Sequence, residues 1–302
     1  MTVYDVIIVG GGPAGLNAAV VLGRCRRNVL LFDKGTQRNL SSSGLRNYLT
    51  RDNIVPSDFL SIAYKEIKKY RVKTTLAEIV HAEKLQDNLF IARDGTGSKY
   101  YSRKFLIATG LKDNIPAIPG IENFYGKSIF HCPYCDGWEV REKIIGIYAK
   151  NRNGFELAIS MKTWSQHVTL YTDRRNYLKP LEKEVLQKKN IRVVAEKIIA
   201  LEGKPGRLSR ILLDNDKKER CDALFFVNGY EQQCNIAKSL GCNMTKKGVV
   251  ITNRLQQANI PGLYVAGDVS KDMQFVVVAA AEGAKAGVSI NKELQKEDFK
   301  AR

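Results

Sequence analysis

Apolar and polar residues follow two different periods along this chain, and the two periods alternate. Short apolar runs rich in valine and isoleucine are typical of buried strands, whereas apolar residues spaced three or four apart predict amphipathic helices. This alternation predicts an α/β fold with parallel sheets. We expect a loop at residues 36–53 and a frayed, charged end in the last dozen residues. The predicted strands are 3–9, 28–32, 99–107, 144–149, 168–172, 222–227 and 262–268, with others inside 72–94 and 192–213, and the predicted helices are 16–23, 56–70, 155–164 and 275–290.

The first predicted strand leads into a glycine-rich turn, Gly10-Gly-Gly-Pro-Ala-Gly15, which a helix follows. Gly10, Gly12 and Gly15 let the turn tighten and the backbone approach a pyrophosphate, and the start of the helix offers free N–H groups and the positive end of its dipole. The second strand ends at Asp33, whose carboxylate can accept hydrogen bonds from ribose hydroxyls. This combination predicts a dinucleotide-binding site, and the alternative is an ordinary glycine-rich turn.

A second strand–turn–helix unit begins at residue 144, but its turn reads Ala149-Lys-Asn-Arg-Asn-Gly154. Lys150 and Asn151 stand where glycines are required, and side chains there would crowd an approaching pyrophosphate. The pattern indicates a nucleotide-binding unit whose phosphate turn has been lost or altered. Arg174 and Arg175, which follow the next strand, are either ligands for a 2′-phosphate or solvated surface residues.

Two cysteines lie in the stretch His131-Cys-Pro-Tyr-Cys-Asp-Gly-Trp-Glu139. The spacing of Cys132 and Cys135 lets a disulfide open and close with little backbone movement and lowers the thiol pKa. Asp136 follows at once and can pass a proton to a leaving thiolate. A redox-active pair is the favoured interpretation, and half of a zinc site or two inert cysteines are the alternatives. A structural zinc needs four ligands, and the other four cysteines form no second close pair, so we predict no metal.

The length of 302 residues is enough for two domains. Six cysteines at irregular spacings do not form the framework of a small secreted protein. The first residues lack the basic start of a signal peptide, and no apolar run approaches the roughly 20 residues of a membrane span. We therefore expect a cytoplasmic protein that does not bind membranes.

The formal net charge of +17 comes from Lys and Arg residues scattered through the whole length. Three interpretations stay open: a basic solvated surface, electrostatic steering toward an acidic partner protein, and nucleic-acid binding. The absence of a concentrated basic tract disfavours nucleic acid.

Four motifs together carry a resemblance to a known family: the glycine turn with Asp33, Ala108-Thr-Gly110, Cys132-x-x-Cys-Asp136 and Ala266-Gly-Asp268. In this order and spacing they resemble the low-molecular-weight thioredoxin reductases, over essentially the whole chain. The cysteine stretch is similar to a side branch, the thioredoxin-reductase-like flavoproteins that include fungal dithiol oxidases. The resemblance implies a homodimer of chains with two Rossmann-like domains, in which a discontinuous FAD-binding domain (1–115 and 244–302) carries an inserted NADPH-domain-like segment (116–243).

The resemblance also implies a role for each motif. Cys135 faces the flavin, Cys132 attacks the substrate disulfide and Asp136 is the nearby acid. Asp33 contacts the adenosine ribose, and Asp268 contacts the ribityl or pyrophosphate portion. The remaining implied cofactor contacts are Gly10, Gly12, Pro13, Ala14, Gly15, Lys34, Arg38, Asn39, Ile79, Ala108, Thr109, Gly110 and Gln274.

The implied activity is that of an FAD-dependent dithiol/disulfide oxidoreductase acting on a thioredoxin-like protein or a small dithiol. The altered second turn leaves the use of NADPH open. The alternative is therefore an NADPH-independent flavoprotein, either a reductase supplied by an acidic electron-donor protein such as a ferredoxin, or an oxygen-dependent dithiol oxidase. A flavoprotein that senses redox state without turnover is a further class.

Overall fold

The computed structural model describes residues 2–86, 88–270 and 273–300. Two compact units divide the chain: unit 1 contains residues 1–40, 47–112 and 231–302, and unit 2 contains residues 41–46 and 113–230. The predicted α/β fold is confirmed, and unit 1 is discontinuous in sequence, as expected. Each unit has its own sheet and its own core.

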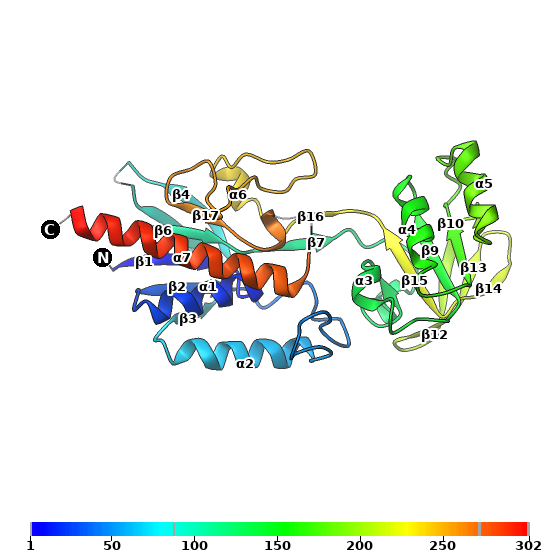
Figure 1. Ribbon diagram of the computed structural model, residues 1–302, viewed down its shortest axis with the longest axis horizontal. Coiled ribbons are helices and arrows are strands. Elements are labelled where there is room, and N and C mark those ends of the chain that lie inside the picture. The colour runs from blue at the N-terminus through cyan, green and yellow to red at the C-terminus, as the bar shows by residue number, and fades with distance from the viewer. Residues whose placement is uncertain (1, 87, 271–272, 301–302) are drawn as a thin grey trace. The chain divides into compact units, whose positions relative to one another are not determined.

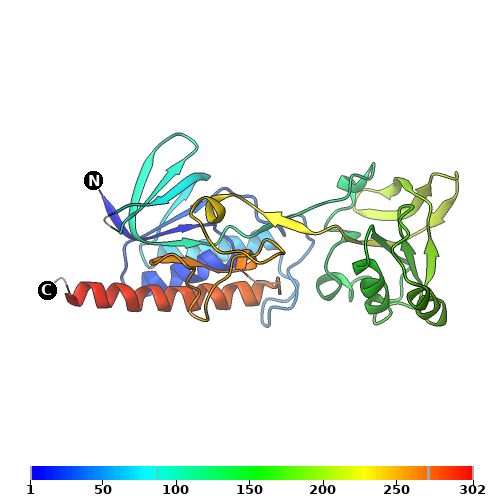
Figure 2. The same ribbon diagram turned by 90° about the horizontal axis from the view of Figure 1, so that it is seen from above.

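Unit 1 is built on a seven-stranded sheet of order β3-β2-β1-β6-β5-β4. The seventh strand, β17, lies off this order and pairs with the last residues of β6, Phe105 to Ile107. The strands β1, β2, β3, β6 and β17 run parallel, and β4, β5 and β6 are joined by antiparallel pairing. Figure 2 shows the β4–β5 hairpin (cyan) at the edge of this sheet. The bounds are β1 (Val3–Val9), β2 (Val29–Asp33), β3 (Lys73–Leu76), β4 (Ile79–Lys84), β5 (Phe90–Asp94), β6 (Lys99–Ile107) and β17 (Leu263–Val265).

Helices cover this sheet because its central strands are apolar on both faces. Val6, Ile8 and Leu31 face the core under α1 (Pro13–Arg24), α2 (Pro56–Lys68) and α7 (Val276–Lys300), while the alternate residues face a second core that includes α6 (Ile236–Ser239). Figure 1 shows α7 (red) lying along α1 (blue). Gly283 makes this approach possible, because a Cβ there would overlap the carbonyl of Ala14.

The last turns of α7 are helical to residue 300, so the prediction of a frayed end is wrong for the described residues. Arg103 forms ion pairs with Glu297 and Asp298, at 2.9 and 2.8 Å, and Lys104 pairs with Glu297 at 2.5 Å. Basic residues on β6 therefore hold the charged end of α7 in place. The sequence of the helix itself does not reveal these distant partners.

Unit 2 has a parallel sheet of order β11-β10-β9-β15-β8. The helices α4 and α5 cover one face, and the small antiparallel sheet β12-β13-β14 covers the other. The bounds are η1 (Ile121–Asn123), β8 (Ile129–Phe130), α3 (Pro133–Asp136), β9 (Ile145–Ala149), α4 (Asn153–Met161), β10 (Val168–Tyr171), α5 (Pro180–Lys188), β11 (Arg192–Val194), β12 (Ile198–Lys204), β13 (Arg207–Leu213), β14 (Lys218–Arg220) and β15 (Ala223–Val227).

The chain passes between the units along β7 (Leu111–Asp113) and β16 (Tyr230–Gln232), which pair with each other. The return after residue 230 comes earlier than the predicted boundary at 243, because Ile236 and Ala237 of α6 are buried in the core of unit 1. The short segment 41–46 belongs to unit 2 although its neighbours on both sides belong to unit 1. No pattern of apolar or polar residues in this stretch predicts the excursion.

Candidate active site

The first glycine turn joins β1 to α1 at the carboxyl end of the sheet of unit 1. Gly10 has a φ of +116°, and a Cβ there would overlap the carbonyl of Ala108, while a Cβ on Gly15 would overlap the carbonyl of Gly10. Gly12 differs from both, since a Cβ on it would meet no atom of the described chain within 4 Å. Pro13 then opens the helix, and Ala14 is buried in its first turn. Gly10 and Gly15 therefore shape the turn, and Gly12 leaves space above it for a ligand.

Asp33 ends β2 beside this turn, where Tyr64 of α2 donates a hydrogen bond to its carboxylate at 2.5 Å and Gln37 donates one at 2.6 Å. The Tyr64 hydroxyl also lies close to Gly11. Burial raises the pKa of Tyr64, and the bond to Asp33 raises it further. Tyr64 and Gln37 fix the orientation of the predicted ribose acceptor, and neither was predicted from the sequence.

Ala108, Thr109 and Gly110 follow β6 on the other side of the turn. The Ala108 N–H donates to the Val9 carbonyl at 2.8 Å, and Gly110 has a φ of +71°. The Thr109 hydroxyl is buried and has no hydrogen-bond partner among the described residues. A buried hydroxyl of this kind costs free energy unless a ligand or water pairs with it. The position beyond the carboxyl ends of parallel strands is where such sheets bind ligands.

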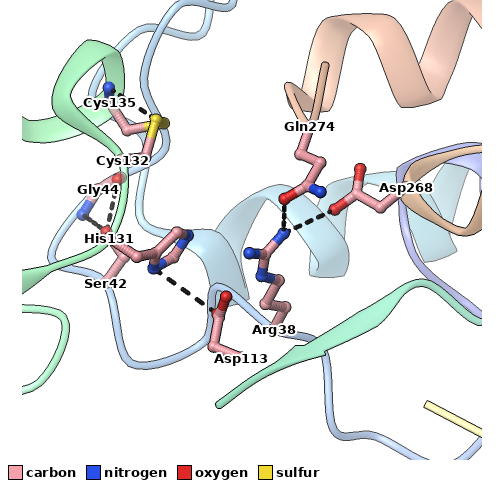
Figure 3. The surroundings of a disulfide bond; sticks show 9 residues. All are labelled: Arg38, Ser42, Gly44, Asp113, His131, Cys132, Cys135, Asp268 and Gln274. Carbon is pink, nitrogen blue, oxygen red and sulfur yellow. Dashed lines mark hydrogen bonds and ion pairs between the residues drawn. A yellow bond between two sulfur atoms is a disulfide. The ribbon is translucent and has the colours of Figure 1, made fainter. Parts of the chain in front are cut away.

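Arg38 joins two further predicted residues of unit 1 (Figure 3). Its Nη1 donates to Asp268 at 3.2 Å and to Gln274 at 2.5 Å. The turn before Asp268 is fixed by the buried Glu282, which accepts a hydrogen bond from the Gly267 N–H at 2.9 Å.

The structure thus brings most of the predicted cofactor residues of unit 1 together. Gly11 lies beside Asp33, and Gly10 lies beside Ala108 and Thr109. A Cβ on Gly267 would lie 2.9 Å from Ala14. A glycine turn with free space, a carboxylate for a ribose and an unpaired buried hydroxyl fit FAD.

Three predicted cofactor residues stand apart from these contacts. Lys34 is exposed and pairs with Glu78 at 3.3 Å. Ile79 is buried at the start of β4, and Asn39 is half-buried in the turn after Arg38. The contacts of these three side chains therefore give no support of their own for a role with the cofactor.

The predicted cysteine pair lies at the start of α3 in unit 2, where Cys132 and Cys135 form a disulfide with a Cα–Cα distance of 5.3 Å. Cys132 precedes the helix, and its Sγ accepts the Cys135 N–H at 3.3 Å. Pro133 occupies the first helical position, where its missing N–H costs nothing. Figure 3 shows the two cysteines joined at this point, Cys135 in the short helix and Cys132 just before it.

Aromatic residues surround the helix α3. The side chains of Tyr134 and Trp138 are 66% and 65% exposed. The ring of Tyr134 packs edge-on against Trp164 at 5.8 Å. Trp164 approaches so closely that a Cβ on Gly137 would lie 2.7 Å from its ring, which explains why glycine follows Asp136. Two exposed aromatic side chains therefore lie within three residues of the cysteine pair in sequence.

Asp136 follows Cys135 directly, and burial raises its pKa to about 7. The charge of Arg46 lowers this pKa and the charge of Glu139 raises it. A carboxyl with a pKa near neutrality can both donate and accept a proton under physiological conditions. The pKa of Asp136 is therefore compatible with the acid role that was predicted from the sequence, and that role stays a prediction.

His131, just before the cysteines, faces a buried carboxylate. Its Nδ1 lies 3.6 Å from Asp113 (Figure 3). Asp113 also accepts a hydrogen bond from Tyr125 at 2.9 Å. The described residues contain no group of three or more His, Cys, Asp or Glu side chains placed to hold a metal ion. None of the described helices is long and apolar enough to cross a bilayer.

Comparison with known proteins agrees with this arrangement. Residues 4–283 match the pyridine nucleotide-disulphide oxidoreductases. The chain belongs to this family. The thioredoxin reductase aclD of Aspergillus oryzae is 28% identical over 303 residues, which are 96% of each protein. HlmI is 29% identical with a TM-score of 0.95 over 99% of this chain and 95% of that one. TrxB from Bacillus anthracis is 30% identical with a TM-score of 0.93 over 98% and 100%.

The resemblance predicted from four motifs is therefore confirmed. This pyridine nucleotide-disulphide oxidoreductase is an enzyme of the thioredoxin-reductase type, an FAD-dependent disulfide oxidoreductase with two Rossmann-like domains. Members of the family generally use FAD and a nicotinamide nucleotide. In a unit of this kind the nicotinamide nucleotide would bind at the second turn, between β9 and α4.

Charged side chains of this chain occupy the second turn, between β9 and α4. Lys150 pairs with Asp173 at 2.7 Å, and Asp173 also accepts the Tyr148 hydroxyl at 3.0 Å. The bonds to Asp173 and Tyr148 raise the pKa of Lys150. Arg152 donates to the buried Glu182 at 2.5 Å.

Gly154 and the two arginines after β10 complete the surroundings of the second turn. A Cβ on Gly154 would overlap Ala149 and lie 2.7 Å from the Tyr177 hydroxyl, so this glycine serves the packing of helix on strand. Arg174, one of the two candidates for a 2′-phosphate, pairs with Asp214, and Arg175 is exposed. These residues do not fit a nucleotide pyrophosphate.

Proposed function

We propose that this enzyme exchanges electrons between FAD bound at the first glycine turn and the Cys132–Cys135 pair, and through this pair with a dithiol or disulfide substrate. The observation that carries the proposal is the placement of Asp136 next to the redox pair, with a pKa of about 7. FAD supplies, when bound, a carrier for two electrons. Asp136, which follows Cys135 directly, can supply or accept a proton that accompanies these electrons.

The two cysteines have separate roles in this proposal. A substrate thiolate attacks Cys132, and the S–S bond to Cys135 breaks, so that Cys135 leaves as a thiolate. Asp136 donates a proton to the leaving sulfur, and the second substrate thiol then displaces Cys132. The substrate is oxidised to its disulfide while the enzyme disulfide becomes a dithiol. The reverse sequence reduces a substrate disulfide.

We propose further that NADPH is not the electron source. This second proposal is supported by the ion pairs Lys150–Asp173 and Arg152–Glu182, which occupy the turn where a pyrophosphate would lie. The electrons then go from a substrate dithiol to oxygen, which becomes hydrogen peroxide, or come from an acidic donor protein. The formal charge of +17 favours an acidic donor through electrostatic steering.

The remaining finer assignments are also proposals. The substrate is a thioredoxin-like protein or a small dithiol, and the exposed rings of Tyr134 and Trp138 offer it apolar contacts beside the disulfide. We propose a cytoplasmic homodimer, in keeping with the resemblance. Aspergillus oryzae aclD, named a thioredoxin reductase, supports the disulfide chemistry and leaves the natural substrate open.

The test is oxidation of dithiothreitol, followed by oxygen uptake and by anaerobic bleaching of the flavin. Cys132→Ser and Cys135→Ser should each abolish turnover while FAD stays bound, because the redox pair is broken. Cys234→Ser, which alters a half-buried free cysteine of unit 1, is the matched control and should retain activity. Full activity of Cys135→Ser would contradict the proposal.

A further inference from the structure

The short segment 41–46 reaches the redox centre of unit 2 from the sequence of unit 1. Its backbone is held in place, since the Ser43 N–H donates to the Gly126 carbonyl at 3.3 Å and Leu45 is buried. The turn at Gly126 has a φ of +75° and approaches so closely that a Cβ there would lie 2.5 Å from the Ser41 carbonyl oxygen. The segment therefore delivers its last residue, Arg46, to a defined place.

Arg46 forms an ion pair beside the active-site helix. Its Nε lies 2.8 Å from Oε1 of Glu139, which follows Asp136 by three residues. The Arg46 side chain is only 10% exposed. In the described part of the chain, Nη1 of Arg46 and Oε2 of Glu139 are buried without a hydrogen-bond partner. Each charged group thus uses one polar atom within the ion pair and has another that finds no partner among the described residues.

Buried unpaired atoms on a charged pair cost free energy, and an apolar pair of similar size would avoid that cost. Their presence at this place indicates a use. Near a carboxyl, a positive charge lowers its pKa and a negative charge raises it. Arg46 and Glu139 are the two charged groups that act on Asp136 in this way.

We propose that Arg46 and Glu139 are a positioning pair whose fixed opposite charges set the proton exchange of Asp136 with the active-site sulfurs. The proposal rests on the proposed function, in which Asp136 is the acid for the cysteines. It assigns a role to a segment that the sequence motifs do not include. Neither residue touches the reacting sulfur atoms in this account, and both act through Asp136.

The sign of each effect follows from the charges. Removing Arg46 leaves Glu139 without its counter-charge, so the pKa of Asp136 rises above about 7 and the protonated form persists to higher pH. Removing the charge of Glu139 leaves Arg46 alone, so the pKa of Asp136 falls. Removing both charges returns it toward the wild-type value. A merely structural role would not produce opposite shifts.

The experiment measures the anaerobic rate of flavin reduction by dithiothreitol as a function of pH, using the FAD-loaded enzyme. Wild type should show an inflection near pH 7 that Asp136→Asn lacks. Arg46→Met should move this inflection up by about one pH unit and Glu139→Gln should move it down by about as much. Arg46→Lys, which keeps the charge, should restore most of the wild-type profile. The double variant R46M/E139Q should lie between the single variants.

Other titratable groups are present in the experiment, namely the two thiols of the reduced pair, the thiols of dithiothreitol and the imidazole of His131 beside Asp113. The Asp136→Asn variant identifies which inflection belongs to the carboxyl. Arg141→Met is the matched control, since Arg141 is exposed and its guanidinium lies 4.1 Å from the ring of Trp138. It should leave the inflection unchanged, and the FAD content of each variant checks that the protein is folded.

The outcomes separate the two proposals. Loss of the inflection in Asp136→Asn with no shift in Arg46→Met and Glu139→Gln, or with shifts in the same direction, would overturn the positioning pair and leave the proposed function intact. An Asp136→Asn profile identical to that of wild type would overturn the acid role of Asp136 and the positioning pair together.

Discussion

The two strand–turn–helix units of this chain share one scaffold and differ in what fills the turn. In the first turn, glycines bring the helix and the neighbouring strand within contact distance, and no described atom would lie within 4 Å of a Cβ on Gly12. In the second turn, Gly154 preserves the same close packing of helix on strand. Where the first turn has glycines, however, the second turn carries Lys150 and Arg152, each paired with an acid of unit 2.

The comparison shows that the packing role of a glycine turn and its binding role can be separated. Packing of helix on strand needs one small residue, and the second unit has kept it. Binding needs free N–H groups without side chains in front of them. A fold can therefore keep its architecture while the residues of one binding turn change.

The largest effect should come from filling the free space of the first turn. Gly12→Val should lower the FAD content of the purified protein at least tenfold, because the side chain would occupy the place of the pyrophosphate. Gly12 has a φ of −82°, which any residue can adopt, so the apoprotein should keep its stability to within about 0.5 kcal/mol. Asn151→Val, the equivalent change in the second turn, should leave the FAD content unchanged. An equal loss of FAD in Gly12→Val and Asn151→Val would contradict the claim that only the first turn binds FAD.

A smaller effect should follow from opening the ion pair of the second turn. Lys150→Met leaves Asp173, whose side chain is 8% exposed, with the Tyr148 hydroxyl as its remaining partner. The free energy of unfolding should fall by about 1 kcal/mol in urea titrations followed by circular dichroism. Lys218→Met is the control, because its pair with Glu202 is exposed and contributes within about 0.5 kcal/mol. No loss of stability in Lys150→Met would mean that this pair does not hold the turn.

The smallest effect should come from the exposed arginine after β10. Arg175→Ala should leave activity and stability unchanged, since no 2′-phosphate is bound there in this account. Steady-state rates with each electron donor measure this. A rate with NADPH that falls tenfold in Arg175→Ala would show that the second turn still receives a nucleotide.

The glycine turns and the cysteine pair were predictable because their requirements are local. Strand, turn and helix follow one another within about 30 residues in such a unit, and Cys132, Cys135 and Asp136 lie in one stretch. The residues that orient them were not predictable. Tyr64 reaches Asp33 from 31 residues away, and Arg46 reaches Glu139 from 93 residues away. These contacts depend on where α2 and the segment 41–46 lie in the folded chain. The periods and spacings of the sequence do not predict those positions.

The domain boundaries and the chain end illustrate the same limit. The inserted segment was expected to end at residue 243, but the α6 residues just before that point are buried in unit 1. The charged end of α7 looked frayed, but Arg27 pairs with Asp298 at 2.7 Å. The charge and polarity of a segment predict whether it is exposed only when no distant residue pairs with it or packs against it.

The most direct test of the contrast between the turns is an anaerobic titration of the FAD-loaded enzyme with NADPH and with NADH, followed by the visible absorbance of the flavin. Dithiothreitol and dithionite serve as positive controls for reduction. The account predicts no bleaching by either nucleotide and full bleaching by both controls. Rapid, stoichiometric bleaching by NADPH would contradict it, because the second turn would then bind a nucleotide despite its ion pairs.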